Sequence, residues 1–277
     1  MTEPDSVHPP PASAAAPAGS PFPPVRTVTV AAPFAWLARG AADLRRAPAA
    51  SLAYGAIFAL MGLAIAVVFR QAYQYTSALV AGFLLLGPFL ATGFYDISRR
   101  LEAGQPARFA DTTTAWRGNL GAFSLFALGL TIIMLIWARA SLVTFALFFS
   151  SGMPTLDRFI AQVLSVEHLD FVLTYVAVGA LFAAIVFAVS VVSVPMMLDR
   201  GTDTVVAAIT SVRALFTNPL PLAIWALLIV AIIGLGFASA FIGLVVAVPL
   251  IGHATWHAYK DLVAPTANEN GFPLARE

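Results

Sequence analysis

Long apolar runs that carry almost no charge alternate with short polar segments along this chain. An α-helix rises 1.5 Å per residue, so about 20 residues are needed to cross roughly 30 Å of hydrocarbon. Six runs reach that length and predict membrane spans at residues 51–69, 76–95, 120–138, 171–198, 219–237 and 239–259. The last two come from one continuous apolar run, which we divide near Gly234, Gly236 and Ser239 because a tight turn is easiest there.

Two stretches between the third and fourth spans leave alternatives open. Residues 140–150 are apolar, so they either extend the third span as one long helix or lie on the outer membrane surface. Beyond them, apolar residues recur at helical spacing over 156–164, among acidic and basic residues that reach 170. This pattern predicts an amphipathic helix on the outer interface or capping the bundle.

The spans come in pairs that share one pattern. A short amphipathic stretch with arginine comes first, at residues 34–46, 108–117 and 202–216, and the second span of each pair contains a proline (Pro88, Pro195 or Pro249) before a charged stop. We therefore expect an all-α fold: a polytopic transmembrane helical bundle of six spans, arranged as three helical hairpins with interfacial amphipathic helices. The units would be repeats over 34–104, 108–201 and 202–262.

Composition agrees with a membrane protein and describes the ends of the chain. Hydrophobic residues make up 60% and charged residues 10%, against about 25% charge in an ordinary soluble domain. Residues 1–33 are rich in proline and alanine and predict a disordered arm before a membrane domain at 34–263, and residues 264–277 predict a polar tail. The net charge of +1 without a basic stripe predicts no nucleic-acid partner.

The basic residues predict the orientation. With six spans and both ends inside, 12 of the 15 basic residues fall on the cytoplasmic side, and only Arg70, Arg139 and Arg158 fall outside. Short cytoplasmic loops carry an excess of Lys and Arg, so this partition predicts that the N- and C-termini are both cytoplasmic.

Two histidines are the candidate cofactor-binding residues. His253 and His257 are four residues apart, so both rings lie on one helical face near the cytoplasmic end of the last span. One hypothesis is a haem, quinone or metal ligand role, with only Asp96 or Asp199 at the same depth to complete a metal site. The plainer interpretation is packing and hydrogen bonding at the interface, and the prediction includes no bound metal or cofactor.

Catalysis and ion-coupled transport have little support in the sequence. Asp96, Asp199 and Asp261 all lie at span ends beside Arg or Lys, where surface ion pairing is the ordinary role, and none falls in the middle of a span. The sequence carries no phosphate-binding loop, dinucleotide fingerprint, zinc-protease helix or nucleophile elbow, and no cysteine. We expect no enzyme activity.

Several stretches together resemble a known family. They are 43–48 with 54–55, 82–89 with Tyr95, 98–102, 193–200, 218–221 with Trp225, and 252–259. They are similar to the bacterial predicted integral membrane proteins called domain of unknown function 2189, over about residues 36–263. The resemblance implies a multi-pass protein of the bacterial inner membrane and brings no known activity, cofactor or substrate.

The leading functional hypothesis is a non-enzymatic accessory or interaction protein, embedded in the lipid bilayer with a membrane protein partner or a second copy of itself. One alternative is a transporter or channel-like protein for an uncharged or amphiphilic solute, with a path lined by Ser124, Thr131, Ser190 and Ser193. Another is a haem- or quinone-binding redox subunit that uses His253 or His257. A transporter predicts a polar seam on facing helices, and an accessory protein predicts an apolar bundle core and an exposed aromatic flank.

Overall fold

The computed structural model describes residues 22–72, 75–148 and 169–265, and helices are the only extended regular elements in these ranges. In chain order they are α1 (Ala32–Arg46), α2 (Pro48–Gln71), α3 (Thr76–Glu102), α4 (Phe109–Thr112), the 3-10 helix η2 (Ala115–Asn119), α5 (Leu120–Phe148), α7 (Leu169–Ser190), α8 (Ser193–Arg200), α9 (Thr204–Thr217), α10 (Pro219–Ala238) and α11 (Leu244–Leu262). The all-helical fold is as predicted.

Five segments of the described chain are long and apolar enough to cross a membrane: Pro48–Gln71, Leu79–Glu102, Phe109–Phe148, Leu169–Arg200 and Pro219–Ala238. They contain the first five predicted spans, apart from the first three residues of the second. The sixth prediction falls on α11, which is 19 residues long but is not among these segments. Its second half carries His253, His257 and Lys260, so it lacks the long apolar stretch that defines those segments.

One of the two open stretches is now assigned. Helix α5 continues without a break to Phe148, so residues 140–148 extend the third span. The amphipathic helix predicted over 156–170 falls almost entirely on residues 149–168, which lie outside the described residues.

The fourth predicted span is divided near its end. Helix α7 stops at Ser190, a turn follows, and α8 starts at Ser193. Pro195 explains the division, because proline has no N–H to bond the carbonyl of Val191 and its ring clashes with that carbonyl. By contrast, Pro88 and Pro249 lie inside continuous helices.

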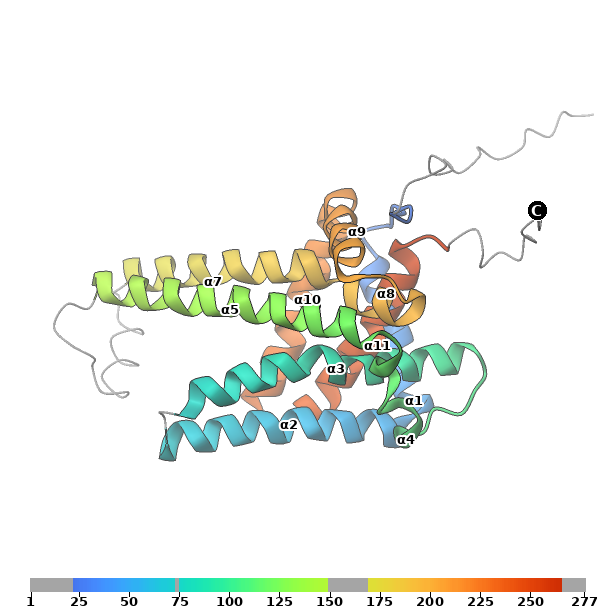
Figure 1. Cartoon of the computed structure of the whole chain (residues 1–277), viewed down its shortest axis with the longest axis horizontal. Helices are drawn as coiled ribbons and strands as arrows, with labels where there is room; N and C mark the ends of the chain where they lie inside the picture. The colour runs from blue at the N-terminus through green and yellow to red at the C-terminus, as the bar shows by residue number, and fades with distance from the viewer. Residues whose placement is uncertain (1–21, 73–74, 149–168, 266–277) are drawn as a thin grey trace, which may run out of the picture.

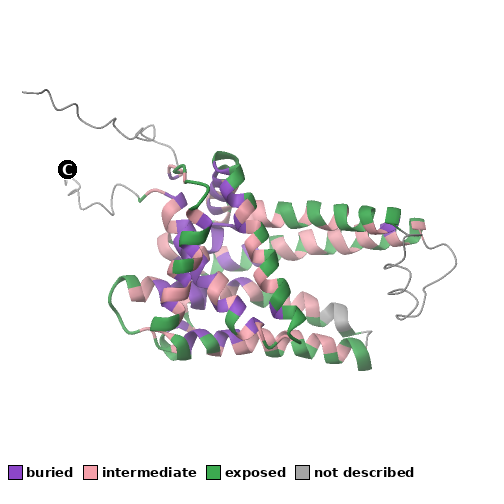
Figure 2. Cartoon of the chain, turned by 180° about the vertical axis from the view of Figure 1, so that it is seen from behind, coloured by how far each residue is buried: buried purple, intermediate pink, exposed green. Residues whose placement is uncertain are grey.

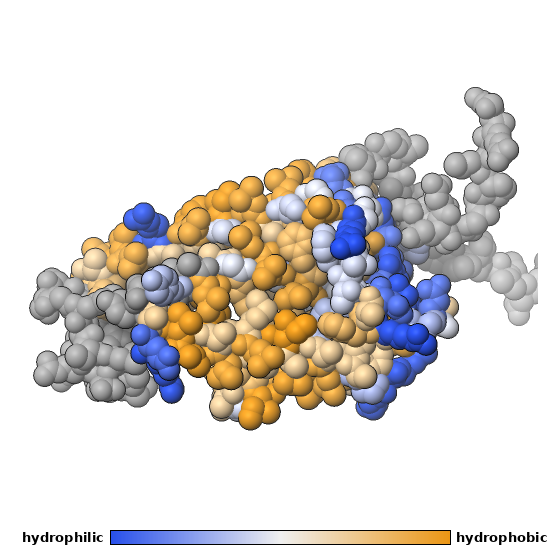
Figure 3. Space-filling view, turned by 60° about the horizontal axis from the view of Figure 1, so that its bottom comes forward, coloured by the Kyte–Doolittle hydropathy of each residue, from blue (hydrophilic) through white to orange (hydrophobic). Residues whose placement is uncertain are grey.

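Burial is concentrated at one end of the molecule, which we call the polar head. It comprises α1, α4, η2, α8, α9, most of α11, and the adjoining ends of α2, α3, α5 and α10 (Figures 1 and 2). Large buried side chains such as Trp36, Phe94, Trp225 and Trp256 fill it. Away from the head, α2, α3, α5 and α7 extend side by side as largely exposed apolar helices (Figures 1 and 2). In Figure 3, hydrophilic residues gather at the head end of the molecule, and an apolar surface separates them from smaller hydrophilic patches at the far end.

Both described ends of the chain meet at the head. Val25 forms an isolated antiparallel bridge with Val263, and the Arg26 amide donates a hydrogen bond to the Leu262 carbonyl over 2.8 Å. The Asn218 side chain holds the N-terminal segment in place, accepting from the Val28 amide at 2.8 Å and donating to the Arg26 carbonyl at 2.9 Å. The disordered arm predicted for residues 1–33 therefore needs correction from residue 22 onward, because backbone groups there pair with the end of α11 despite the proline-rich composition.

Helices occupy all three stretches that we predicted as interfacial. They are α1, the short pair α4 and η2, and α9. Helix α1 is not only interfacial, because it packs along α11 within the head. The predicted threefold repetition of the whole unit stays a prediction.

Candidate functional site: a buried histidine cluster

The C-terminal half of α11 forms the centre of the polar head and carries both candidate histidines. It packs against α1, α2 and α3, and glycines on these neighbours permit the close approach. A Cβ added at Gly40 of α1 would lie 2.7 Å from the Ala254 amide nitrogen, and one added at Gly55 of α2 would lie 2.1 Å from the Val245 carbonyl oxygen. Only a residue without a side chain lets these backbones come so near.

His253 is completely buried, and both of its ring nitrogens have partners. The Nε2 atom lies 2.9 Å from the Ser51 hydroxyl of α2, and Nδ1 lies 2.9 Å from the Ser98 hydroxyl of α3. The Phe94 ring packs edge-on against the imidazole, with 5.8 Å between ring centroids. Because a neutral imidazole has one donor and one acceptor nitrogen, two hydroxyl groups satisfy it fully. His253 thereby joins three helices.

His257 lies one turn further along α11 and faces acidic groups. Its Nε2 atom is 2.8 Å from the carboxylate of Asp43 on α1, and its Nδ1 atom is 3.6 Å from the carboxylate of Glu102 at the end of α3. Burial raises the pKa of the Asp43 carboxyl, but hydrogen bonds from His257 and Ser98 and the nearby imidazoles outweigh it. The pKa of Asp43 is therefore below its ordinary value, and the carboxylate is the form present at neutral pH.

The partners of the two histidines give the metal and haem hypotheses little support. In the described part of the chain, no group of three or more His, Asp or Glu side chains is arranged to hold a metal ion. A haem ligand needs a ring nitrogen that faces open space, whereas both nitrogens of His253 are engaged in a fully buried position. The geometry favours the hydrogen-bonding role that the sequence also allowed for both histidines.

The three acidic residues at the span ends all have basic partners. Asp96 accepts hydrogen bonds from Arg99 and, at 2.8 Å, from Arg100. Asp261 pairs with Arg39 and accepts from the Trp36 indole over 2.8 Å. Asp199 accepts from the Tyr259 hydroxyl over 2.7 Å and lies 3.4 Å from the Lys260 ammonium. Pairing was expected, but the site of Asp96 was not: this carboxylate is buried, not on the surface.

The hydroxyl groups proposed for a solute path do not form a seam. Ser124 is exposed, Thr131 donates to the Ala127 carbonyl of its own helix at 2.8 Å, and Ser193 donates to the Val189 carbonyl at 2.5 Å. Ser190 has a buried hydroxyl for which the described residues supply no hydrogen-bond partner. Two of the four hydroxyls are thus satisfied locally, and this arrangement gives a transport path no support.

Sequence reasoning missed the partners of the histidines. Asp43, Ser51, Ser98 and Glu102 lie on three other helices, each at least 155 residues before the histidine that it contacts. Three of them, Asp43, Ser98 and Glu102, do fall in the stretches that carry the family resemblance. Polar residues inside otherwise apolar helix ends were the available signal, because buried polar groups need partners.

Comparison with known protein families gives a match over the central part of the chain. The model of the family described as predicted integral membrane protein (DUF2189) matches residues 76–199, which run from α3 to α8. No curated protein matches the chain, and no solved structure does. The resemblance inferred from the sequence is thus confirmed for this central segment. Over residues 76–199, this chain is similar to the DUF2189 family of predicted integral membrane proteins.

Proposed function

We propose that this protein is a non-enzymatic accessory protein of the bacterial inner membrane, with six membrane-inserted helices, whose α5–α7 pair binds another membrane protein. The observation that carries this proposal is the contrast in packing between the polar head and the α5–α7 pair. The head buries its aromatic residues and pairs most of its buried polar groups. The α5–α7 pair is left largely uncovered.

The contact between the chain ends supports an even number of crossings. Val25 and Val263 form a backbone bridge, so residues just before α1 and just after α11 lie on the same side of a membrane. Five crossings would place them on opposite sides. The contacts of α2 with α3, α5 with α7, and α10 with α11 support three hairpins. We therefore count α11 with the five longer segments.

The charge distribution supports a cytoplasmic head. Arg39, Arg99, Arg100, Arg200 and Lys260 all belong to the head. Arg70 and Arg139 lie on the parts of α2 and α5 that extend away from it. Positive residues are retained on the cytoplasmic side of the inner membrane, and this rule favours a cytoplasmic position for both chain ends.

The α5–α7 pair has the features of a partner-binding element. At its far end, Phe171 packs against the rings of Phe145, Phe148 and Tyr175, with centroids 5.6 to 6.2 Å apart, so the two helices are held together. Along its length, Leu135 of α5 is 57% exposed, and Leu181 of α7 is 60% exposed. Helices in lipid associate by van der Waals packing, and an uncovered apolar pair offers a surface for it.

Photo-crosslinking in cells tests this proposal. A photoreactive phenylalanine analogue at Leu135 should give a discrete crosslinked protein band, which mass spectrometry identifies as another membrane protein. The matched control places the same analogue at Leu227 of α10, which is 69% exposed and should give no discrete band. A band containing only a second copy of this chain would show that α5 and α7 form a homo-oligomer and do not bind a different protein. Equal results at both positions would refute a binding role for α5 and α7.

A further inference from the structure

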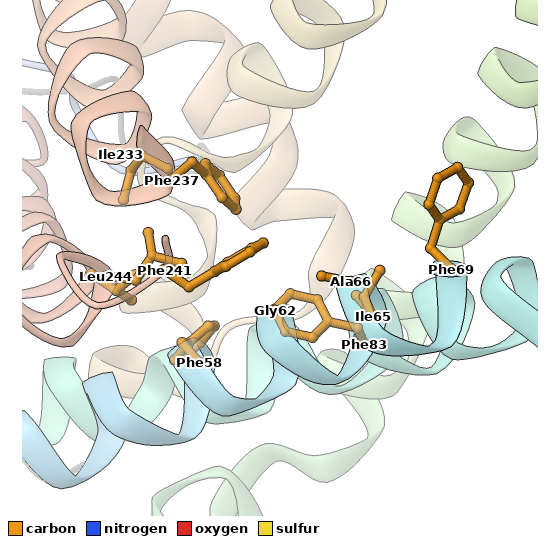
Figure 4. A pocket seen from close by; sticks show the side chains of 11 residues that line it. Phe58, Gly62, Ile65, Ala66, Phe69, Phe83, Ile233, Phe237, Phe241 and Leu244 are labelled. Carbon is orange, nitrogen blue, oxygen red and sulfur yellow. The ribbon is translucent and has the colours of Figure 1, made fainter. Parts of the chain in front are cut away.

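An apolar cavity of about 680 Å³ lies between α2, α3, α10 and α11, away from the histidine cluster (Figure 4). Phe58, Gly62 and Phe69 of α2 line it, together with Phe83 of α3, Phe237 of α10 and Phe241 of the α10–α11 turn. Its lining is apolar almost throughout. Its volume is within the range of about 300–1,000 Å³ typical of small-molecule sites.

The cavity exists because the α10–α11 hairpin ends before α2 does. The Phe241 ring in the turn lies against Gly62, where an added Cβ would be 2.8 Å from the ring. Helix α2 continues beyond this contact to Gln71, and Phe69 still lines the cavity. Seven residues of helix separate Gly62 from Phe69, which is about 10 Å of uncovered α2 surface.

The α10–α11 turn, which lines the cavity through Phe241, is strained. Ala240 and Phe241 adopt φ values of 53° and 70°, the left-handed region that residues with a Cβ rarely occupy. The Phe237 ring packs edge-on against Phe241, with centroids 5.5 Å apart. Such strain persists where surrounding contacts enforce it, often beside ligands. Here it holds the Phe241 ring across the cavity.

The surroundings determine which ligand the cavity can take. Helices α2, α3 and α10 belong to candidate membrane spans, so hydrocarbon is the medium at this depth. An apolar cavity gives water no hydrogen-bonding partners. Arg70 follows Phe69 directly and is exposed at the end of α2, at the depth of lipid headgroups if α2 spans the bilayer. An arginine at that level matches a phosphate.

We propose that this cavity is a phospholipid site, in which one acyl chain lies along α2 between Gly62 and Phe69 and the lipid phosphate pairs with Arg70. The lipid comes from the leaflet at the Arg70 end of the protein. Its chain completes the packing that the short α10–α11 hairpin leaves open. The site is independent of the α5–α7 surface and stands whether or not that surface binds a partner.

Native mass spectrometry of the whole protein, extracted in a mild detergent, tests the site. The wild type should retain one phospholipid. Ala66→Phe fills the cavity, since Ala66 is part of its lining, and should lower the retained fraction about tenfold. Ala64→Phe is the matched control, because Ala64 is exposed on the same helix outside the lining and its substitution should leave the lipid bound.

A second pair of variants tests the phosphate contact without altering the packing. Arg70→Gln should also lower phospholipid retention about tenfold, whereas Arg139→Gln, an exposed arginine on α5, should not. Both glutamine variants change exposed side chains, so they should fold as the wild type does. Retention that is unchanged in Ala66→Phe or in Arg70→Gln, or equally reduced in either control, would overturn the proposal.

Discussion

The single side chain of His253 joins three helices of the polar head, α2, α3 and α11. The sequence predicts that His253 and His257 share a face of the last helix, because their spacing is one helical turn. It does not predict that Ser51 and Ser98 bond one ring and Asp43 bonds the other. Those contacts join residues 155 to 214 positions apart. Helical periodicity within one element carries no information about them.

Removing one hydroxyl from this junction should be costly. In Ser98→Ala, the Nδ1 atom of buried His253 loses its partner, so we expect a loss of about 1–3 kcal/mol in the free energy of unfolding. Equilibrium unfolding in mixed detergent micelles measures it. Ser124→Ala, at an exposed site on α5, should change stability by less than about 0.5 kcal/mol. Similar losses in both variants would mean that the junction contributes nothing specific.

The Asp43 carboxyl should make stability depend on pH. Its folded pKa is below the ordinary value of 3.8, so its contribution is fully present above about pH 3.8 and is lost as the pH falls through the folded pKa. We expect the difference in melting temperature between the wild type and Asp43→Asn to shrink in that acidic range. His257, His253 and Ser98 act on Asp43, and Glu102 faces His257; all four remain in both proteins, so the difference reports on Asp43 together with its contact to His257. If this difference in melting temperature grew on acidification, the lowered pKa of Asp43 would be contradicted.

At the scale of helices, apolar length and proline position predict much of the structure. Pro48 and Pro219 occupy the first turns of α2 and α10, where the missing N–H costs nothing. The division between α7 and α8 was not predicted, because the three span prolines look alike in the sequence. In the structure, Pro88 and Pro249 lie inside continuous helices, whereas Pro195 follows the turn between α7 and α8. Which proline interrupts a helix depends on its neighbours in space, and these cannot be read from spacing.

The same substitution should have opposite effects on two helices. Gly55→Ala places a Cβ 2.1 Å from the Val245 carbonyl oxygen, so α2 and α11 must separate. We expect the free energy of unfolding to fall by about 1–3 kcal/mol. Gly129→Ala on α5 meets no atom within 4 Å. It should stabilise the helix by about 0.5–1 kcal/mol, since alanine restricts the unfolded chain. Thermal unfolding of the two variants side by side measures both signs. Stabilisation in both would show that α2 and α11 are not in close contact.

At the scale of the whole molecule, the sequence predicts a membrane protein more readily than it predicts where the core lies. The long apolar runs identify the spans, but fewer than half of the residues in each span are buried in the single chain. The core forms instead in the head, where α11, the long helix that is not among the five candidate spans, is the most buried. Its histidines, aromatic residues and charged end find partners across α1, α2, α3 and α8, a tertiary arrangement that hydropathy does not encode.

Single-cysteine labelling tests the central claim most directly, because the chain has no native cysteine. Val30, Pro265 and Tyr75, all exposed, are each replaced by cysteine and treated in intact cells with a membrane-impermeant maleimide. The account predicts that Tyr75→Cys, between α2 and α3, is labelled from outside, whereas Val30→Cys and Pro265→Cys are labelled only after the membrane is permeabilised. Labelling of Pro265→Cys but not Val30→Cys in intact cells would place the chain ends on opposite sides and contradict the paired-end, six-helix architecture.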